Sequence, residues 1–399
     1  MTRRQGKPLR IAITGAGIGG LTAAALLSDQ GHEVTLFDQF DRPRPVGSGL
    51  VIQPVGRRVL DAIGAGEMAR AHGQKIQRML GRDAFSGRRV LDVSYGKSYG
   101  LAIHRGALFN SLLDAVQRRH VPVCPDHKVT GHMMTDRAGT RLVFADRSLS
   151  ATFDLIVDAS GAHSTLSPLK ARPLPYGAIW TTVDWPDTGL PQTELSQRYR
   201  RADRMIGIIP IGTLPGENRP KAALFWSLPR NGYDSWRSAG LAAWKDDALS
   251  LWPALVPFLD QITDPDQMIM ARYSHGTLRR PYGAGIVHIG DAAHRASPQL
   301  GQGANMALLD AWALAQALRH FPLEKALPAY ARARRAHVFA YQWMSAAFTP
   351  QYQSDSRILP VVRDRILFPL SILPPAKQLL TLLVKGTLLP PLGYLTPTG

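Results

Sequence analysis

The 399-residue sequence predicts an α/β fold in which a parallel sheet is assembled from distant segments, beside an antiparallel sheet and a helical C-terminal region. Two glycine-rich strand–loop–helix units, one near the N-terminus and one after residue 285, predict the parallel sheet. Between them lie short strands rich in Ile, Trp, Tyr and Phe that are separated by Pro and Gly turns, a pattern typical of an antiparallel sheet. The chain is long enough for two or three domains.

The first unit begins with a short β-branched strand at Leu9–Thr14. The glycine turn Gly15–Gly20 follows, and then an Ala- and Leu-rich segment predicts a helix over Leu21–Gln30. A second strand, Glu33–Phe37, ends at Asp38. This order of strand, G-x-G-x-x-G, helix, strand and acid is typical of a Rossmann-like dinucleotide-binding domain.

Each feature of that motif has a physical role. Gly15 lets the chain turn sharply, Gly17 lets the backbone approach a diphosphate, and Gly20 lets the helix pack closely on the strand. The helix N-terminus offers free N–H groups to an anion. Asp38 can accept hydrogen bonds from a ribose, but the motif alone does not separate NAD from FAD.

The second unit starts from a predicted strand at Ile286–Ile289 and continues through Gly290–Asn305 into a predicted helix over Met306–Leu318. Its glycine-rich helix start can also present N–H groups to an anion. Asp291, at the strand end, is suited to hydroxyl groups. We interpret His294 as a packing residue beneath the loop, since the sequence places no partner acid beside it.

Because the two units flank the rest of the chain, the nucleotide-binding domain must be discontinuous. We predict that it comprises residues 1–72, 100–175 and 276–327, with residues 73–99 and 176–275 forming a β-sheet domain for the substrate and residues 328–399 a helical C-terminal cap. Strands are expected at Pro175–Val183, Glu194–Arg200, Met205–Ile211, Lys221–Leu228 and Met268–Tyr273, and a helix at Gly240–Phe258.

A sheet laid over a cofactor forms an apolar pocket with few polar groups, the usual form of a small-molecule site. Each candidate for its lining could instead be a core residue of the sheet, which is the commoner role of an aromatic there. These candidates are Trp180, Ile209, Pro210, Trp226, Tyr273 and His275. No Ser-His-Asp arrangement, zinc motif or paired-carboxylate signature is present, so no side chain is assigned as catalytic and no metal is expected.

The net charge of +17 does not indicate a nucleic-acid partner, because no basic run is interleaved with aromatic residues. Cys124 is the only cysteine and no apolar run reaches the length of a membrane span, so a cytoplasmic protein is expected. For the tail we favour a cap over the nucleotide-binding domain. A dimer surface and a peripheral membrane contact through Leu379–Leu383 and Lys385 remain alternatives.

The segments Gly15–Gly20, Asp158–Gly161 and Gly290–Asn305 together resemble the single-component FAD-dependent aromatic hydroxylases, of the para-hydroxybenzoate and salicylate hydroxylase type. The resemblance implies an FAD monooxygenase that takes hydride from NADH or NADPH. It would then insert one atom of O₂ into a small aromatic or related electron-rich substrate through a flavin C4a-hydroperoxide. Such a protein would be a monomer or a homodimer.

The resemblance also implies which residues contact the adenosine half of FAD. Gly15, Gly17 and Gly20 would meet the diphosphate and Asp38 the ribose, although the family usually has Glu there. The backbone of the strand that contains Val129 would lie against the adenine.

For the flavin half, Arg105 matches the family's flavin-binding arginine, and Asp291 would hold the ribityl chain or the diphosphate side. Pro298 lies in the loop before Gly303, Ala304 and Asn305, whose N–H groups would face the flavin pyrimidine edge. These N–H groups would stabilise the negative charge of the reduced flavin.

The middle segment departs from the family pattern, because Ser160 replaces the Asp of an Asp-Gly pair and the arginine that usually follows is missing. Asp158 could supply a carboxylate instead. The change leaves open whether hydride comes directly from a nicotinamide or from an external reductase. An FAD-dependent reductase or epoxidase, and a non-catalytic flavin-binding membrane-surface protein, therefore remain alternatives.

Overall fold

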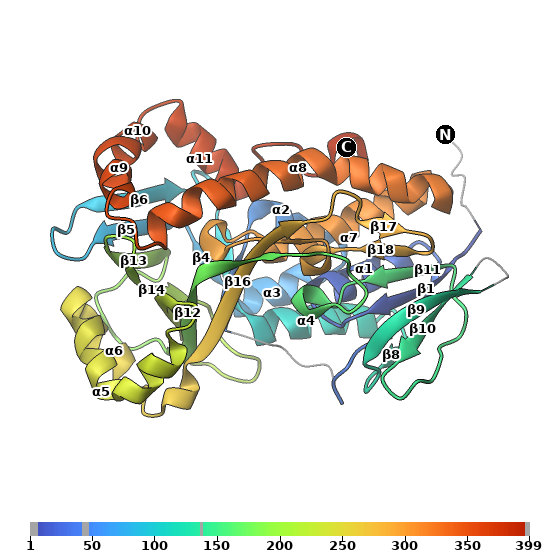
Figure 1. Cartoon of the computed structure of the whole chain (residues 1–399), viewed down its shortest axis with the longest axis horizontal. Coiled ribbons are helices and arrows are strands. Elements are labelled where there is room, and N and C mark those ends of the chain that lie inside the picture. Colours follow the sequence, from blue (N-terminus) through green and yellow to red (C-terminus); the bar gives the residue numbers. More distant parts are fainter. Residues whose placement is uncertain (1–6, 42–47, 136–138, 396–399) are drawn as a thin grey trace.

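The computed structural model describes residues 7–41, 48–135 and 139–395. One end of the molecule holds a six-stranded sheet and the other an eight-stranded sheet, and the long helix α8 (Leu323–Tyr352) runs across both (Figure 1). Within each sheet, segments that lie far apart in the sequence are neighbours.

The six-stranded sheet has the order β17-β18-β11-β1-β2-β8, and all its neighbours are parallel except β17. Ile11, Ala12 and Ile13 of the central strand are fully buried, as expected for a strand covered on both faces. The strands are β1 (Arg10–Thr14), β2 (Glu33–Phe37), β8 (Val123–Cys124), β11 (Leu155–Asp158), β17 (Tyr282–Gly283) and β18 (Ile286–His288).

Three helices pack together in the largest hydrophobic core beside this sheet: α1 (Ile18–Ser28), α4 (Arg105–Gln117) and α7 (Gly303–His320). A Cβ atom added to Gly19 would lie 3.5 Å from the Cβ atom of Ala307, so α1 and α7 are in close contact. The two glycine-rich units, about 275 residues apart in the sequence, are therefore neighbours.

Smaller elements complete this half. Strand β7 (Gly100–His104) lies between β3 (Gly49–Ile52) and β4 (Gln74–Ile76), and β9 (Val129–Thr135) pairs with β10 (Gly139–Phe144). Two short helices are α2 (Pro54–Ala62) and α3 (Gly66–His72).

The eight-stranded sheet has the order β19-β16-β12-β15-β14-β13-β5-β6. The prediction of an antiparallel sheet is wrong for one pair, since β13 and β5 are parallel. Strand β5 enters from more than 100 residues upstream, so no tight hairpin forces the two strands to be antiparallel. The strands are β5 (Arg78–Asp83), β6 (Arg89–Ser94), β12 (Arg172–Asp184), β13 (Glu194–Arg200), β14 (Arg204–Pro210), β15 (Lys221–Pro229), β16 (Ile269–Thr277) and β19 (His294–Arg295).

Helices α5 (Tyr233–Leu251) and α6 (Val256–Leu259) bury one face of this sheet. The expected start of α5 at Gly240 is wrong, because the helix begins seven residues earlier and Gly240 forms a kink with φ +83°. Helix α8 begins five residues before residue 328, the predicted start of the C-terminal cap, and it includes Pro328 and Pro350. Flanking residues such as Leu327 and Tyr330 are buried, and their packing maintains the helix despite the lost N–H groups.

The C-terminal segment forms α9 (Leu359–Val362), a π turn, α10 (Phe368–Ser371) and α11 (Ala376–Lys385). Leu383 and Val384 are buried against the rest of the protein. Within the described ranges, no individual helix has the length and apolar character of a membrane span, although Leu359–Ser371 and Ala376–Lys385, bent by 96°, meet that criterion as a pair.

Candidate cofactor site

In the first glycine turn, the backbone segments lie too close together to leave room for side chains. Gly15 has φ +96°, and a Cβ atom there would lie 2.7 Å from the carbonyl oxygen of Ala159. A Cβ atom on Gly20 would lie only 1.9 Å from the carbonyl oxygen of Gly15. Side chains at both positions are excluded sterically, so this turn requires glycine.

Gly17 differs from its neighbours because it faces open space. It is exposed, and no atom lies within 4 Å of where its Cβ atom would be. It precedes the first turn of α1, whose N–H groups have no intrahelical partner. The N-terminus of α1 thus offers hydrogen-bond donors and positive dipole charge beside an open surface.

Asp38 is buried at the end of β2 and already has two backbone partners. Its carboxylate accepts hydrogen bonds from the N–H groups of Ala16 (2.6 Å) and Phe40 (3.0 Å). Each oxygen keeps a further lone pair, so the carboxylate can still accept a bond from a hydroxyl group. In this arrangement Asp38 also supports the glycine turn itself.

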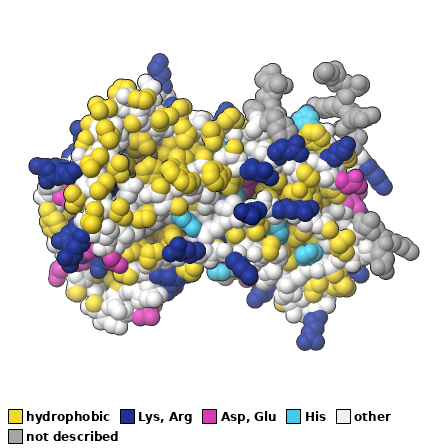
Figure 2. All heavy atoms as spheres, turned by 45° about the horizontal axis from the view of Figure 1, so that its top comes forward, with side chains coloured by type: hydrophobic (Ala, Val, Ile, Leu, Met, Phe, Trp, Pro, Cys, Tyr) yellow, Lys and Arg dark blue, Asp and Glu magenta, His cyan; other side chains and the backbone are white. Residues whose placement is uncertain are grey.

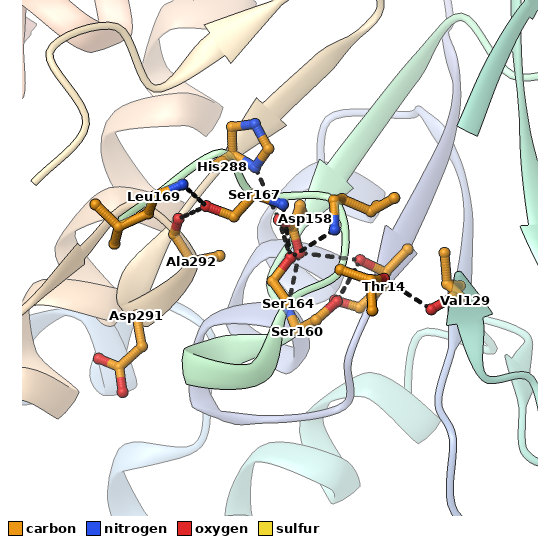
Figure 3. Close-up of polar contacts among 12 residues, drawn as sticks. Thr14, Val129, Asp158, Ser160, Ser164, Ser167, Leu169, His288, Asp291 and Ala292 are labelled. Carbon is orange, nitrogen blue, oxygen red and sulfur yellow. Dashed lines mark hydrogen bonds and ion pairs between the residues drawn. The ribbon is translucent and has the colours of Figure 1, made fainter. Parts of the chain in front are cut away.

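The middle segment holds the first turn in place rather than facing a ligand (Figure 3). The Asp158 side chain is fully buried and accepts hydrogen bonds from Ser164 Oγ (2.6 Å) and the Ser160 N–H group (3.1 Å), with His288 Nδ1 at 2.8 Å. Burial by itself would raise the pKa of Asp158, but the bonds from His288 and Ser164 outweigh it and lower the pKa. The suggestion that Asp158 replaces the missing carboxylate is therefore wrong, since no face of it is free.

Arg105 and Asp291 are two opposite charges that lie within electrostatic reach of each other. Both side chains are exposed by surface area, and neither has a hydrogen-bond partner among the described residues. Desolvation nevertheless lowers the pKa of Arg105 and raises that of Asp291, and Asp291 lines a small cavity together with Gly303. Asp291 points away from the Asp158 network in Figure 3, and each of the two charges shifts the pKa of the other.

The start of α7 is fixed by the side chain of Asn305, a role that the sequence did not reveal. Its Oδ1 accepts a hydrogen bond from the Gln53 N–H group (2.8 Å), and its Nδ2 donates to the carbonyl oxygens of Val51 (3.2 Å) and Gly301 (3.1 Å). No atom lies within 4 Å of a Cβ atom built on Gly303. The helix N-terminus at Gly303 and Ala304 is therefore tied to β3 and faces open space.

Pro298 and Val129 lie in segments that have other evident contacts. Pro298 is exposed and begins a short 3₁₀ turn that the side chain of Ser297 caps. The carbonyl oxygen of Val129 accepts a hydrogen bond from Thr165 Oγ1 (2.9 Å), which ties β9 to the middle segment. Their contacts with a cofactor remain predictions.

A buried ion network lies directly behind the second unit. Asp310 on α7 accepts hydrogen bonds from Arg334 Nε (2.7 Å) and from the Gly290 N–H group (2.9 Å), and His294 Nε2 lies 2.6 Å from it. The interpretation of His294 as lacking a partner acid is wrong, because Asp310 follows it by 16 residues across the loop. Asp310 interrupts an otherwise apolar helix in the sequence, and a buried acid usually has a charged or hydrogen-bonding partner. This interruption could have predicted the pairing.

The network strongly favours the charged form of Asp310. Burial would raise its pKa, but His294 and Arg334 outweigh burial and lower the pKa to about 2. Arg334 is itself buried and also bonds to the carbonyl oxygen of Pro391. The network thus joins the loop after β18, helices α7 and α8, and the C-terminal segment.

Among the pocket candidates, Trp180, Tyr273 and Ile209 lie on the face of the large sheet opposite α5. Trp180 Nε1 donates a hydrogen bond to Tyr273 Oη (3.0 Å), and its ring stacks on Phe225. Burial raises the pKa of Tyr273 to about 12, with the charge of Arg105 acting against it. Tyr273 therefore keeps its proton and lies within the electrostatic reach of Arg105.

His275 acts as a link between elements. Its Nε2 accepts a hydrogen bond from the Ser297 N–H group (2.8 Å) and lies 3.1 Å from Ser345 Oγ on α8. Desolvation lowers the pKa of His275, which favours the neutral, accepting ring.

The structure excludes Trp226 from the pocket. Side chains alternate along β15, and Trp226 faces α5, where it packs edge-on against Trp244. Pro210 is buried at the end of β14, where it pairs with Ala222. Because side chains alternate along a strand, Pro210 lies on the same face of the sheet as Ile206 and Ile208, which face α5. Periodicity alone could not tell which of the two faces of this sheet meets the site.

A cavity of about 30 Å³ adjoins the second unit, with room for roughly two waters. Its lining includes Asp291, His294, Gly303, Met306, Tyr341 and Ser345. The larger hollow, about 430 Å³, is an open surface groove between β12 and β15 that contains none of the predicted cofactor residues.

These observations fit a dinucleotide with a flavin. Two helix N-termini with uncovered glycines suit a diphosphate and an electron-rich ring edge. The carboxylate of Asp291 at the cavity suits the hydroxyl groups of a ribityl chain, and the guanidinium of Arg105 suits an anionic group. When bound there, FAD would supply the redox chemistry that no described side chain provides.

Comparisons with known proteins agree with this geometry. The model of the "FAD binding domain" family matches residues 9–207 and 245–342. The FAD-dependent urate hydroxylase of Klebsiella pneumoniae is 26% identical over 328 residues, covering 78% of this chain and 82% of the relative. The 3-amino-4-hydroxybenzoate 2-monooxygenase of Streptomyces cremeus is 26% identical over 334 residues, covering 76% and 77%.

Solved structures show the same fold. Klebsiella pneumoniae HpxO, in complex with FAD and uric acid, superposes with a TM-score of 0.80 at 20% identity and covers 98% of each chain. The tetrameric form of 2-methyl-3-hydroxypyridine-5-carboxylic acid oxygenase gives a TM-score of 0.77 at 21% identity, covering 94% and 96%. Since the family model spans both glycine-rich units and most of the sheet between them, the chain belongs to the FAD binding domain family of flavoproteins.

Proposed function

We propose that this protein is an FAD-dependent, NAD(P)H-consuming monooxygenase that hydroxylates a small aromatic or related electron-rich substrate. The observation that carries the proposal is the cluster of Arg105, Asp291 and Tyr273, in which Arg105 shifts the pKa of both other residues and Asp291 lines the cavity beside Gly303. This cluster joins the cofactor cleft to the Trp180 face of the large sheet. The names of the relatives, which include urate, 3-amino-4-hydroxybenzoate and kynurenine, support a ring-shaped substrate with oxygen substituents.

In this proposal the first unit binds the adenosine half of FAD. The N-terminus of α1 meets the diphosphate where Gly17 leaves the backbone uncovered, and Asp38 accepts a bond from a ribose hydroxyl group. Gly15 and Gly20 act indirectly, because they shape the turn and do not face open space.

The second unit binds the flavin half. Asp291 holds ribityl hydroxyl groups, and the N–H groups of Gly303 and Ala304 face the pyrimidine edge, where reduction places negative charge. Asn305 acts as a positioning residue, because its side chain fixes this helix start against β3. Preorganised donors of this kind stabilise developing charge without reorganising during the reaction.

On the substrate side, Tyr273 holds a proton that the site can use. Because Trp180 Nε1 already donates to its oxygen, the phenol O–H group is free to donate to an oxygen substituent of the substrate. Arg105 attracts an anionic substituent, and the apolar surface of Trp180 and Ile209 excludes water from the ring. Bound FAD supplies hydride acceptance and oxygen activation.

The source of the hydride remains the open point of the proposal. Ser160 bonds to Thr14 Oγ1 (2.8 Å) and lies in a segment that is fully engaged in supporting the first turn. This segment therefore has no free carboxylate for a nicotinamide, which keeps an externally reduced FAD enzyme as the second candidate. Relatives named as monooxygenases favour direct NAD(P)H use.

Stopped-flow reduction of the bound flavin separates the two candidates. NADH and NADPH are mixed with the holoprotein, each with and without a panel of phenols and heteroaromatic acids. We expect a nicotinamide to reduce the flavin faster when a ring substrate is present, with one O₂ consumed per product. Reduction only by an added flavin reductase, or the absence of hydroxylated product with every ring compound, would contradict the proposal.

The proposal also covers the oligomeric state of the protein and its location in the cell. We propose a monomer or homodimer, and we propose the cytoplasm as its location because the single Cys124 allows no intrachain disulfide. Light scattering of the purified holoprotein measures the first of these directly.

A further inference from the structure

The exposed large hydrophobic residues are concentrated in one part of the molecule. Of the 17 such residues in the described ranges, 11 lie between Phe339 and Leu382, on the outer face of α8 and on α9–α11. We call this the apolar patch: Phe339, Trp343, Ile358, Val361, Ile366, Leu367, Leu370, Ile372, Leu373, Leu379 and Leu382. Figure 2 shows hydrophobic side chains spread widely over this part of the surface. A surface of this kind marks an interaction site.

The patch is not simply the inner, packing side of the C-terminal helices. On α11, Leu383 and Val384 are buried against the protein, whereas Leu379 and Leu382 on the other side are 51% and 40% exposed. On α8, Phe339 and Trp343 are 70% and 65% exposed, whereas Val338 and Met344 are buried. Both α8 and α11 thus have apolar side chains on two sides. One side packs against the rest of the protein, and the other side is exposed to solvent.

Charged residues around the patch are mostly basic. Between residues 356 and 395 the chain has five Lys or Arg residues and one acid, Asp364, which pairs with Arg363 at 2.6 Å. Arg357, Arg365 and Lys377 are exposed and form no ion pair with other described residues. The margin of the patch is therefore positively charged, in a protein of net charge +17.

We infer that the apolar patch is a docking surface for an anionic lipid bilayer. Exposed Leu, Ile and Trp side chains can enter the boundary between headgroups and acyl chains, while Arg357, Arg365 and Lys377 meet anionic headgroups. The bent pair Leu359–Ser371 and Ala376–Lys385 has the apolar composition for this contact. Each arm is shorter than the roughly 20 residues of a span, so the pair lies on the bilayer and does not cross it.

Sedimentation with lipid vesicles tests the inference. The holoprotein is mixed with vesicles of phosphatidylcholine containing 30% phosphatidylserine, about the composition range of an anionic leaflet. We expect binding that falls at least tenfold in the double variant Leu370→Glu, Leu373→Glu. Met134→Glu is the matched control, because Met134 is 60% exposed on β9 at the other end of the molecule, and it should bind as the wild type does.

The positive charge around the patch provides a second, independent test. Binding should weaken several-fold on pure phosphatidylcholine, in high salt, and in the variant Arg365→Gln, Lys377→Gln. These changes leave the apolar side chains and the packing side of α11 intact, so a loss here does not reflect unfolding.

A second copy of the chain is the competing occupant, and the same samples distinguish it. If the wild type is a dimer by light scattering, the double Glu variant is a monomer, and neither binds vesicles, the inference is overturned. Equal vesicle binding by the wild type and the double Glu variant, with both folded and loaded with FAD, overturns it as well.

Discussion

The two glycine-rich units both hold an uncovered helix N-terminus in position, but they do so by different contacts. In the first unit the turn is held mainly by backbone approach, since Gly20 touches the carbonyl oxygen of Gly15 and Asp38 bonds to backbone N–H groups. In the second unit, side chains of α7 itself hold the helix start by bonding to distant segments: Asn305 bonds to the backbone of β3 and Asp310 to Arg334 on α8.

This difference bears on how each unit should respond to change. A backbone-built turn tolerates no side chain where atoms touch, yet depends little on pH or on remote segments. A side-chain-built turn depends on buried charges, and a buried pair that loses one partner leaves the other uncompensated. The predictions below separate these two modes, from the largest expected effect to the smallest.

Gly20→Val should prevent stable folding, with a loss above about 4 kcal/mol, because its Cβ atom would overlap the Gly15 carbonyl oxygen. Gly17→Val is the matched control within the same turn. Gly17 has open space and an extended backbone, so this variant should keep its melting temperature without ligand but fail to retain FAD. Thermal unfolding and flavin absorbance measure both. A Gly17→Val protein that retains stoichiometric FAD would place the diphosphate elsewhere.

Asp310→Asn should destabilise the second unit by about 3–5 kcal/mol, since Arg334 would remain buried without its counter-ion. Urea unfolding at neutral pH checks this value. Asp92→Asn, at a partly exposed ion pair with Arg78, serves as the control and should cost about 1 kcal/mol or less. An equal loss of unfolding free energy in the two variants would show that the buried network contributes no more to stability than a partly exposed ion pair.

The same network predicts a dependence of stability on pH. The pKa of Asp310 is lowered to about 2, so its contribution to stability is complete above its unfolded pKa near 4 and is lost as the pH falls toward 2. The loss attributable to this group is about 2–3 kcal/mol. Unfolding measured from pH 5 to pH 2 should therefore be steeper in the wild type than in Asp310→Asn, and parallel curves would refute the assignment.

Arg105→Met should weaken FAD binding at least tenfold, which is about 1.4 kcal/mol, while leaving the fold intact. The guanidinium has no protein partner among the described residues, so its removal breaks no internal contact. Fluorescence titration of the apoprotein with FAD measures the change, with the exposed Arg88→Met as control. Unchanged affinity would remove Arg105 from the cofactor cleft.

Tyr273→Phe and Trp226→Phe compare the two faces of the large sheet. Tyr273→Phe removes the phenol proton on the cleft side and should raise the substrate KM several-fold, about 1 kcal/mol, with little change in melting temperature. Trp226→Phe, on the α5 side, should lower the melting temperature and leave KM unchanged. Steady-state kinetics and thermal unfolding report both, and the reverse pattern would show that the faces were assigned wrongly.

Local motifs predicted much of this molecule. Strands β2 and β13 have the expected ends, and the roles of Gly15 and Gly20 follow from a contiguous pattern in which each residue acts on its neighbours. Residues whose roles depend on distant partners could not be predicted in the same way. Asn305 meets Gln53, and Arg334 meets Asp310, across separations that no periodicity encodes.

The two faces of a sheet present a related difficulty. Alternation showed that Trp180 and Trp226 belong to a half-buried sheet, but both faces of β12 and β15 are covered, one by α5 and the other by the cofactor half. Two apolar faces look alike in a sequence. Only the packing of α5 assigns Trp226 to the core.

The central claim is that both glycine-rich units bind one molecule of FAD. A crystal structure of the holoprotein tests it most directly. We expect the diphosphate at the N-terminus of α1 beside Gly17, and the flavin ring at the start of α7 beside Gly303 with Asp291 on the ribityl chain. A cofactor that contacts only one of the two helix N-termini, or a nucleotide without a flavin in this cleft, would contradict the account.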